Sequence, residues 1–321
     1  MVFPCWTRAD QGRWEWVTKM AVPVEAIKEI EAKVGQPASR LQREFPAPRE
    51  LFHYTSVDAF VSIVEKQELW VSHYRYMNDT KELEYGSAIC RSVALERIGA
   101  IGGKLSERIC NLIPTAIVHT HMMEYYILSF CEVGDLLNQW RLYSESGSGV
   151  SIGFFSRRLP GTTILKCLYE EAQQRTMASE VVDSFVPIIR DYERACTDED
   201  NLVHIAATFL RLLTAATVEM AVTFKHSAFS EEREWRAIIG LFRHEGMTQI
   251  RYRVGRFGLM PYISISPRAT AGTLTGRLPL SSIALGPSRF GFEQREAVEG
   301  FLRKCGYHHL AVTVPDISYR T

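Results

Sequence analysis

The chain has no paired cysteines, no long hydrophobic run and no excess of charge of either sign. Its seven cysteines are scattered and never form a C-x-x-C pair, which favours reduced thiols over a disulfide framework or a zinc site. No stretch approaches the roughly 18 consecutive apolar residues of a membrane span. We therefore expect a cytoplasmic protein that does not enter a membrane.

The charge balance, the glycine pattern and the histidine spacing argue against further classes of protein. The 37 basic residues balance 37 acidic ones, so no global field attracts nucleic acid, although a local basic patch remains compatible with this balance. The stretch SGSGVSIG lacks the lysine of a P-loop and the G-x-G-x-x-G order of a dinucleotide fold. His119 and His121 have no nearby acid or cysteine that completes a ligand set, so no metal is expected.

The hydrophobic periodicity predicts two parts. Residues 1–49 are expected to form an N-terminal extension with one helix over 21–34 and a linker, and Met20 is a candidate natural start. Residues 50–321 are expected to form a single α+β domain, because predicted strands cluster before and after a helical insertion at about 171–225. Its central sheet is expected to be mixed or antiparallel, with flanking helices.

The stretch FKHSAFSEEREWRAIIG, residues 224–240, concentrates charge ahead of an apolar run. Strand alternation places Glu232, Glu234 and Arg236 on one face and residues such as Trp235 and Ala237 on the other. One interpretation is an edge strand whose polar face meets water, with Arg236 compensating the acids. The other is a pair of carboxylates over a cleft.

A second candidate lies where the strand LFHYT turns into a helix. His53 and Thr55 share one strand face, and Tyr54 lies on the other. The free N–H groups of such a junction suit a phosphate or an amide-bearing ligand. The structural alternatives are a core imidazole for His53 and, for Thr55, a capping box with Asp58.

Arg75 and Asn78 are two further candidate site residues. Arg75 could bind a phosphate or a carboxylate, or could pair with Glu82 or Glu84. Asn78 or the residue after it is expected to cap the following helix.

Gln139 and Trp140 place an amide beside a large ring, which is either a stacking platform or part of the core. Cys131 is a nucleophile only if a base approaches it, and a buried structural thiol is the alternative. Arg251 and Arg253 share one strand face that a polyanion could contact.

Several motifs occur in a recognisable order. They are HYTS, LWVSHYRYMND, ILSFCE, QWRLY, GVSIGF, EEREWR, IALGP and SYR. This set resembles a widespread bacterial family of uncharacterised domains from about Leu51 to Arg320, with Ser318 standing where the family has proline. Its first block is similar to the start of DarT-like ADP-ribosyltransferases, and Glu232-x-Glu234 resembles the E-x-E of many such enzymes.

The resemblance implies an ADP-ribosyltransferase-like fold, NAD as the substrate, a protein or nucleic acid as the acceptor, and a role as a toxin or defence effector. Glu234 would stabilise an oxocarbenium-like ribose, and Glu232 would orient or deprotonate the acceptor. The NAD-binding residues it implies are His53, Tyr54, Thr55, Arg75, Asn78, Gln139 and Trp140.

Two other functions stay open on the sequence. One is a non-catalytic interaction module, in which the acids form salt bridges within the sheet. The other is a metal-dependent nuclease or hydrolase, in which Asp79 and Glu82 join Glu232 and Glu234.

Overall fold

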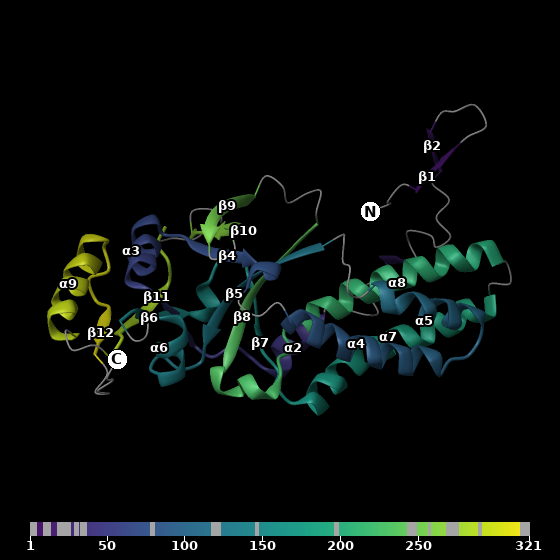
Figure 1. Cartoon of the computed structure of the whole chain (residues 1–321), viewed down its shortest axis with the longest axis horizontal. Coiled ribbons are helices and arrows are strands. Elements are labelled where there is room, and N and C mark those ends of the chain that lie inside the picture. The colour runs from purple at the N-terminus through teal and green to yellow at the C-terminus, as the bar shows by residue number, and fades with distance from the viewer. Residues whose placement is uncertain are drawn as a thin grey trace. The chain divides into compact units, whose positions relative to one another are not determined.

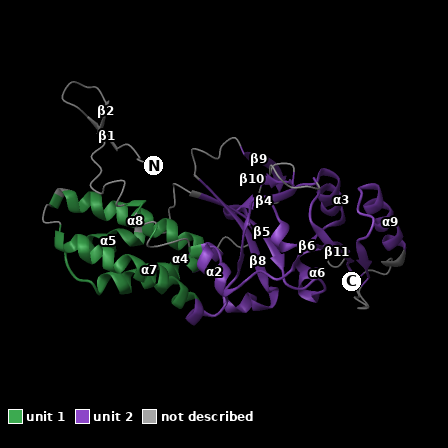
Figure 2. Cartoon of the chain, turned by 180° about the vertical axis from the view of Figure 1, so that it is seen from behind, with its two compact units in different colours: residues 1–37, 86–120, 174–221 green, residues 38–85, 121–173, 222–321 purple. Residues whose placement is uncertain are grey.

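The computed structural model describes residues 5–8, 14–17, 27–28, 32, 37–77, 81–116, 123–144, 148–195, 199–242, 249–255, 258–267, 276–287 and 291–314. The chain divides into two compact units, coloured separately in Figure 2. Unit 1 comprises Met1–Pro37, Gly86–Thr120 and Gln174–Ala221, and unit 2 comprises Ala38–Tyr85, His121–Gln173 and Val222–Thr321. Whether residues 50–321 fold as one domain stays a prediction.

Unit 2 is built on a ten-stranded open sheet, most of whose strands are labelled in Figure 1. Its strands are β3 (Glu50–Thr55), β4 (Leu69–His73), β5 (Met123–Cys131), β6 (Val150–Phe155), β7 (Thr163–Lys166), β8 (Glu234–Phe242), β9 (Ile250–Gly255), β10 (Gly258–Ile265), β11 (Leu280–Leu285) and β12 (Ala311–Thr313). The main path runs β12-β11-β6-β3-β5-β4-β10-β9, and β8 pairs with β5 and β7. The β11–β12 pair is parallel, while the other pairs described are antiparallel. The expected α+β class with a mixed sheet and flanking helices is confirmed.

The sheet splits beside β5. One edge of β5 pairs with β8 along its whole length. The other edge is shared, because β4 pairs at Tyr126 and Ile127 whereas β3 pairs only at Cys131. Between these points β3 and β4 diverge, and residues 128–130 of β5 border the gap.

Helices cover both faces of this sheet. They are α2 (Pro37–Glu44), α3 (Val57–Lys66), α6 (Leu137–Tyr143) and α9 (Gly291–Lys304), with short 3-10 turns η1 (Tyr74–Tyr76), η3 (Ser156–Arg158) and η4 (Ser227–Glu232). Phe60 of α3 and Leu302 of α9 join the large core that contains Leu51 of β3. Trp140 of α6 joins a smaller cluster with Tyr54. Because Leu51 and Tyr54 point to opposite faces of β3, α6 packs on the face opposite α3 and α9.

The expected linker before the main domain is partly helical. Helix α2 occupies residues 37–44, and its Ala38 and Leu41 are buried. Pro37 suits the first turn, where its missing N–H is not needed. The expected helix over 21–34 lies largely outside the described residues, as does Met20, although 27, 28 and 32 are helical.

Unit 1 is mainly helical. It contains α5 (Lys104–Ala116), α8 (Glu199–Ala221) and most of α4 (Lys81–Gly99) and α7 (Glu171–Ala195), together with the antiparallel pair β1 (Cys5–Arg8) and β2 (Trp14–Val17). The Glu193 carboxylate of α7 accepts the N–H groups of Leu105 and Ser106, which satisfies free donors at the start of α5. The helices over 171–225 therefore share their unit with α4 and α5, which the sequence did not predict.

Helix α8 is both long and apolar. Residues 201–221 are long and apolar enough to cross a bilayer by length and composition, and 44% of the most apolar window is buried. Leu202, Ile205, Phe209 and Leu213 recur at helical spacing and are buried. Such a pattern is also that of a core helix, so cellular location stays a prediction.

We predict that Gly86→Ala destabilises the protein. A Cβ at Gly86 would lie 2.3 Å from the backbone oxygen of Ala221, so α4 and α8 must separate locally. The cost is about 1 to 3 kcal/mol and exceeds the gain of roughly 1 kcal/mol in helix propensity. Thermal unfolding followed by circular dichroism measures the change.

Gly300→Ala is the matched control. It is the same substitution in another helix, α9, where a Cβ meets no atom within 4 Å, so the melting temperature should rise slightly. A melting temperature of Gly86→Ala at or above that of the wild type would contradict the close approach of the two helices.

Candidate functional site

Two cavities meet at the split between β3 and β4. The first, of about 510 Å³, is lined by Glu234 and Arg236 and is called the Glu234 cavity. The second, of about 340 Å³, is lined by Trp70 and Arg253 and is called the Trp70 cavity. His53, Met77 and Ser129 line both, so the two cavities adjoin at these residues.

The wall of the Glu234 cavity carries five charged side chains. Arg236 donates to Glu234 through Nε at 2.9 Å and through Nη2 at 3.1 Å. Lys225 Nζ lies 2.8 Å from Glu234 Oε2 and 3.0 Å from Glu82 Oε1, and it also contacts Glu232. Arg236 also donates to Glu82. Three carboxylates and two cations leave a formal charge of −1 on this cluster.

Local structure explains how the cluster is assembled. Glu234 and Arg236 occupy alternate positions at the start of β8, so both side chains leave the same face of the sheet. Lys225 follows a bridge between Leu168 and Phe224, and its N–H donates to the Leu168 carbonyl. That bridge holds the short connection after α8 against the sheet, which directs Lys225 into the cluster.

Glu234 is a fixed anion. It accepts hydrogen bonds from Ser129 Oγ, Lys225 and two nitrogens of Arg236, which occupies about all four lone-pair positions of a carboxylate. Burial alone would raise its pKa, but Arg236 and Lys225 outweigh burial and lower the pKa to about 2. Glu234 is therefore ionised at neutral pH.

Glu232 differs from Glu234 in position and in pKa. It ends the 3-10 turn η4, and the next residue, Arg233, takes the left-handed conformation with φ 46° before β8 begins. Burial raises its pKa, against the opposing effect of Lys225. Lys225 contacts Oε2, whereas Oε1 of Glu232 has no hydrogen-bond partner among the described residues. This carboxylate retains a free oxygen at the cavity wall.

His53 stands at the junction of the cavities. Its Nδ1–H donates to the Ser129 carbonyl at 3.0 Å, so the neutral ring keeps a free lone pair on Nε2. Burial lowers the pKa of His53, with the Ser129 hydrogen bond opposing, so the imidazole is neutral at pH 7. In the Glu234 cavity, burial raises the pKa of Tyr143 to about 12, which keeps its phenol protonated and able to donate.

The structure brings five of the predicted site residues together at one cavity. Those lining the Glu234 cavity are His53, Tyr54, Gln139, Glu232 and Glu234. Thr55 lines the Trp70 cavity instead. Arg75 is exposed, donates to the Tyr74 hydroxyl and is absent from the described lining of both cavities.

Asn78 and Trp140 are the remaining two residues of the predicted NAD-binding set. Asn78 lies outside the described residues. Trp140 is buried in the small core cluster, where its ring packs edge-on against Tyr54 and its Nε1–H donates to Asp135. Its ring therefore supports the position of Tyr54 from within the core cluster.

Three expectations about local structure are wrong. Strand β8 is not an edge strand, because it pairs with β5 and β7, and Glu234 and Arg236 are buried. Glu232 does not share the strand face of Glu234, since the strand starts two residues later. The cap of α3 is Ser56, which accepts from the Ala59 N–H, so Thr55 is free of that role.

Sequence reasoning missed Lys225 and Ser129. Ser129 belongs to an apolar strand, and only the sheet pairing of β5 with β8 sets it opposite Arg236. The signal available for Lys225 was its place as a single cation after a long apolar helix, next to a run of acids. A lysine so placed, when buried, needs carboxylate partners.

The described residues do not support a cysteine nucleophile or a metal centre. Burial raises the pKa of Cys131 to about 11, which disfavours the thiolate that a nucleophile needs. Within the described ranges, no group of three or more His, Cys, Asp or Glu side chains is arranged to hold a metal ion. Asp79, which the metal-dependent alternative required, lies outside those ranges.

Comparison with protein-family models gives one match. Residues 139–237, which are 99 of the 321 residues, match a family described as a protein of unknown function, DUF2971. The matched segment contains Gln139, Lys225, Glu232, Glu234 and Arg236, so it includes most of the charged wall of the cavity. Neither the curated proteins nor the solved structures compared with the chain gave a match.

We predict that Glu234 contributes to stability in a defined pH window. Its folded pKa of about 2 lies below the ordinary value of 4.5, so its stabilising effect is present above pH 4.5 and is lost as the pH falls towards 2. The loss is on the order of 3 kcal/mol. Between these pH values the melting temperature of the wild type should fall more steeply than that of Glu234→Gln, which lacks this titration.

Circular dichroism melts at a series of pH values measure both proteins. Glu231→Gln, the same chemical change at an exposed neighbouring position, controls for the substitution itself. Parallel pH dependence of the wild type and Glu234→Gln would refute the assignment of Glu234 as a buried ion-paired anion.

Proposed function

We propose that the protein is an NAD-consuming transferase of the ADP-ribosyl type. The observation that carries the proposal is the Glu234 cavity, where His53, Tyr54 and Gln139 face a charged wall with a formal charge of −1. Cleavage of the nicotinamide–ribose bond develops positive charge on the ribose, which a negative wall stabilises in the transition state. The ADP-ribosyltransferase-like fold is part of this proposal.

The described geometry supports different roles for the two glutamates. Glu234 has its lone pairs occupied, so it acts as a fixed charge that orients Lys225 and Arg236. Glu232 keeps a free oxygen and a raised pKa, which suits a group that exchanges a proton with a substrate. We therefore assign the catalytic carboxylate to Glu232, where the sequence favoured Glu234.

The proposed reaction transfers ADP-ribose from NAD to the acceptor. The bond between C1′ of the ribose and the nicotinamide nitrogen breaks, and neutral nicotinamide leaves with the electron pair. A nucleophile of the acceptor forms the new bond to C1′ and passes its proton to Glu232. His53, neutral and with Nε2 free, can accept a hydrogen bond from a ribose hydroxyl.

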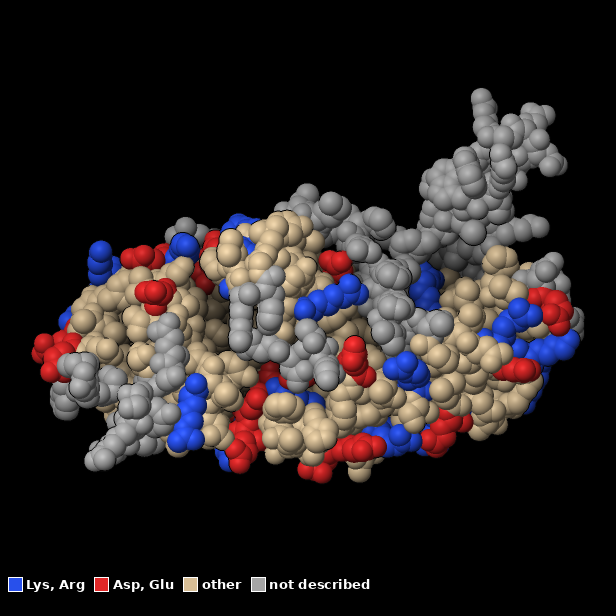
Figure 3. Space-filling view, viewed as in Figure 1, with Lys and Arg blue, Asp and Glu red and all other residues tan. Residues whose placement is uncertain are grey.

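The acceptor is proposed to be a protein or a nucleic acid, in the cytoplasm. On the face of the molecule seen in Figure 3, Lys and Arg side chains are interspersed with Asp and Glu side chains. That face therefore does not present a broad surface of one sign, and it favours neither class of acceptor.

A non-catalytic interaction module is the second candidate. The observation that favours it is the saturation of Glu234 by Arg236, Lys225 and Ser129, which is how a buried structural ion pair is satisfied. The open cavity in front of the cluster favours the transferase instead, because a purely structural network needs no space beside it.

We predict that Glu232→Gln lowers the release of nicotinamide from NAD by about 10²- to 10⁴-fold, the range for loss of a general base. The melting temperature should change little, because Glu232 is half-buried and forms one ion pair with Lys225. Chromatographic measurement of nicotinamide, with and without a cell lysate as acceptor source, tests the prediction.

Glu231→Gln is the matched control, since it neutralises the adjacent, exposed carboxylate. Wild-type protein that neither releases nicotinamide nor shifts its melting temperature with NAD would favour the interaction module. Full activity in folded Glu232→Gln would overturn the assignment of the base.

A further inference from the structure

The Trp70 cavity has the opposite charge to the Glu234 cavity. Its wall contains Lys66, Arg253 and Glu68, two cations and one carboxylate, for a formal charge of +1. Glu68 already has a partner, because Arg251 Nη1 lies 3.4 Å from its Oε2. Arg251 is exposed and is not among the described residues that line the cavity.

Trp70 holds the two cations of this wall in place. Lys66 Nζ and the Arg253 guanidinium each lie 5.6 Å from the centre of its ring, within the range of a cation–π contact. Trp70 belongs to β4, whereas Lys66 ends α3 and Arg253 lies on β9. Two elements, α3 and β9, therefore bring positive charge to the Trp70 ring on a third.

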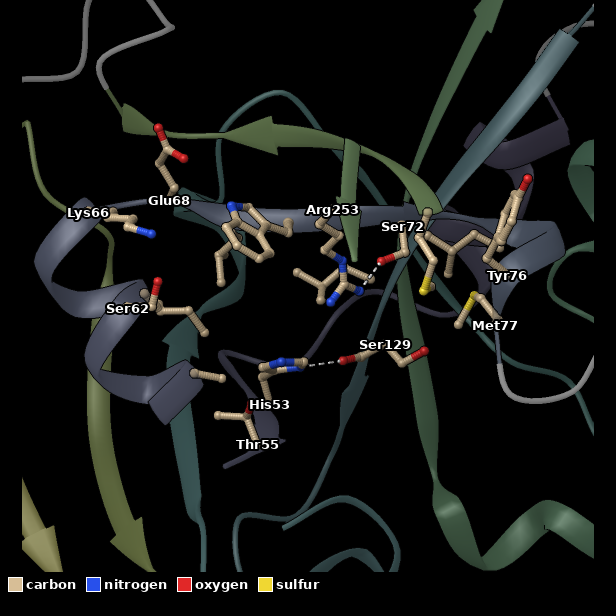
Figure 4. A pocket seen from close by; sticks show the side chains of 17 residues that line it. His53, Thr55, Ser62, Lys66, Glu68, Ser72, Tyr76, Met77, Ser129 and Arg253 are labelled. Atoms are coloured by element: carbon tan, nitrogen blue, oxygen red, sulfur yellow. Dashed lines mark hydrogen bonds between the residues drawn. The ribbon is translucent and has the colours of Figure 1, made fainter. Parts of the chain in front are cut away.

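Arg253 has a donor that its surroundings leave unused. Its Nη2 donates to Ser72 Oγ at 2.9 Å, but Nε is buried and has no hydrogen-bond partner among the described residues. A buried donor without a partner costs about 1 to 3 kcal/mol. Figure 4 shows the guanidinium extending from β9 towards His53, with Lys66 directed into the same space from α3.

We propose that the Trp70 cavity binds the phosphate groups of a nucleotide whose other end occupies the Glu234 cavity. This inference rests on the proposed function and names the part of NAD that each cavity receives. The nicotinamide end of NAD is cationic and its pyrophosphate is anionic, which matches cavities of charge −1 and +1. Arg253 Nε and Lys66 supply the charge-assisted hydrogen bonds.

This assignment replaces Arg75 as the contact for pyrophosphate. Arg75 is exposed and lines neither cavity in the described part of the chain. Arg253 lies about 180 residues later in the sequence, but it lines the Trp70 cavity, where its side chain donates to Ser72. The junction at His53 and Ser129 would then hold the ribose between the two ends.

Binding of ADP, inorganic pyrophosphate and adenosine to the full-length protein, measured by calorimetry, tests the proposal. ADP and pyrophosphate should bind, and adenosine, which lacks phosphate, should bind at least about tenfold more weakly than ADP. Arg253→Gln should weaken ADP binding by about tenfold or more, as expected for loss of one ionic hydrogen bond. Failure of the wild type to bind either ADP or pyrophosphate would overturn the proposal.

Arg75→Gln is the matched control, because it removes the same charge at an exposed position that donates to the Tyr74 hydroxyl and is absent from the described lining of both cavities. Its ADP affinity should stay within about twofold of the wild type. Equal losses in both variants would reduce the effect to long-range charge and refute a contact by Arg253. Arg253→Lys, which keeps the charge but loses Nε–H, should fall between the wild type and Arg253→Gln, and it serves if Arg253→Gln does not fold.

Glu232→Gln separates this proposal from the proposed function. It should lose NAD cleavage but bind ADP as the wild type does. ADP binding that depends on Arg253, in a protein that does not cleave NAD, supports the phosphate site and rejects the transferase. NAD cleavage with an unchanged KM in Arg253→Gln supports the transferase and rejects the phosphate site.

Discussion

The ion pairs of Glu234 with Arg236 and Lys225 are the interaction on which the candidate site depends. A carboxylate buried in a sheet is stable only if cations and donors replace the water it has lost. Arg236 comes from the same strand, Lys225 from the connection after α8, and Ser129 from β5. One buried charge thus fixes the relative positions of three segments, and it does so at the wall of a cavity.

The split in the sheet leaves a cavity in front of this charged wall. If either β3 or β4 continued to pair with β5 past its present contact, backbone pairing would fill the gap that residues 128–130 now border. His53 uses the gap by donating to the Ser129 carbonyl, which keeps that backbone group satisfied without a strand partner. The same divergence places a negative wall and a positive wall on either side of one imidazole.

Sequence periodicity predicted the parts of the site that depend on one segment. Alternation placed Glu234 and Arg236 on one face correctly, and the strand carrying His53 was recognisable from LFHYT. It failed for Glu232, because the left-handed Arg233 ends the alternation at a position where no glycine signals a turn. The pairing of Lys225 with Glu82 and the cavity that Arg253 lines could not be predicted, since each depends on elements that only the tertiary fold brings near.

The two glutamates of the E-x-E sequence are separated by one left-handed residue, and this turn gives them different chemistry. With continuous alternation both carboxylates would enter the same buried network, and both would be neutralised by Arg236 and Lys225. The turn at Arg233 instead leaves Glu232 in contact with Lys225 through one oxygen only. An anion with its lone pairs occupied and a carboxylate with one unpaired oxygen share one lysine, so a change in the protonation of Glu232 alters the charge that Lys225 must balance. Coupling of this kind lets a buried structural ion pair tune the proton affinity of the group beside it.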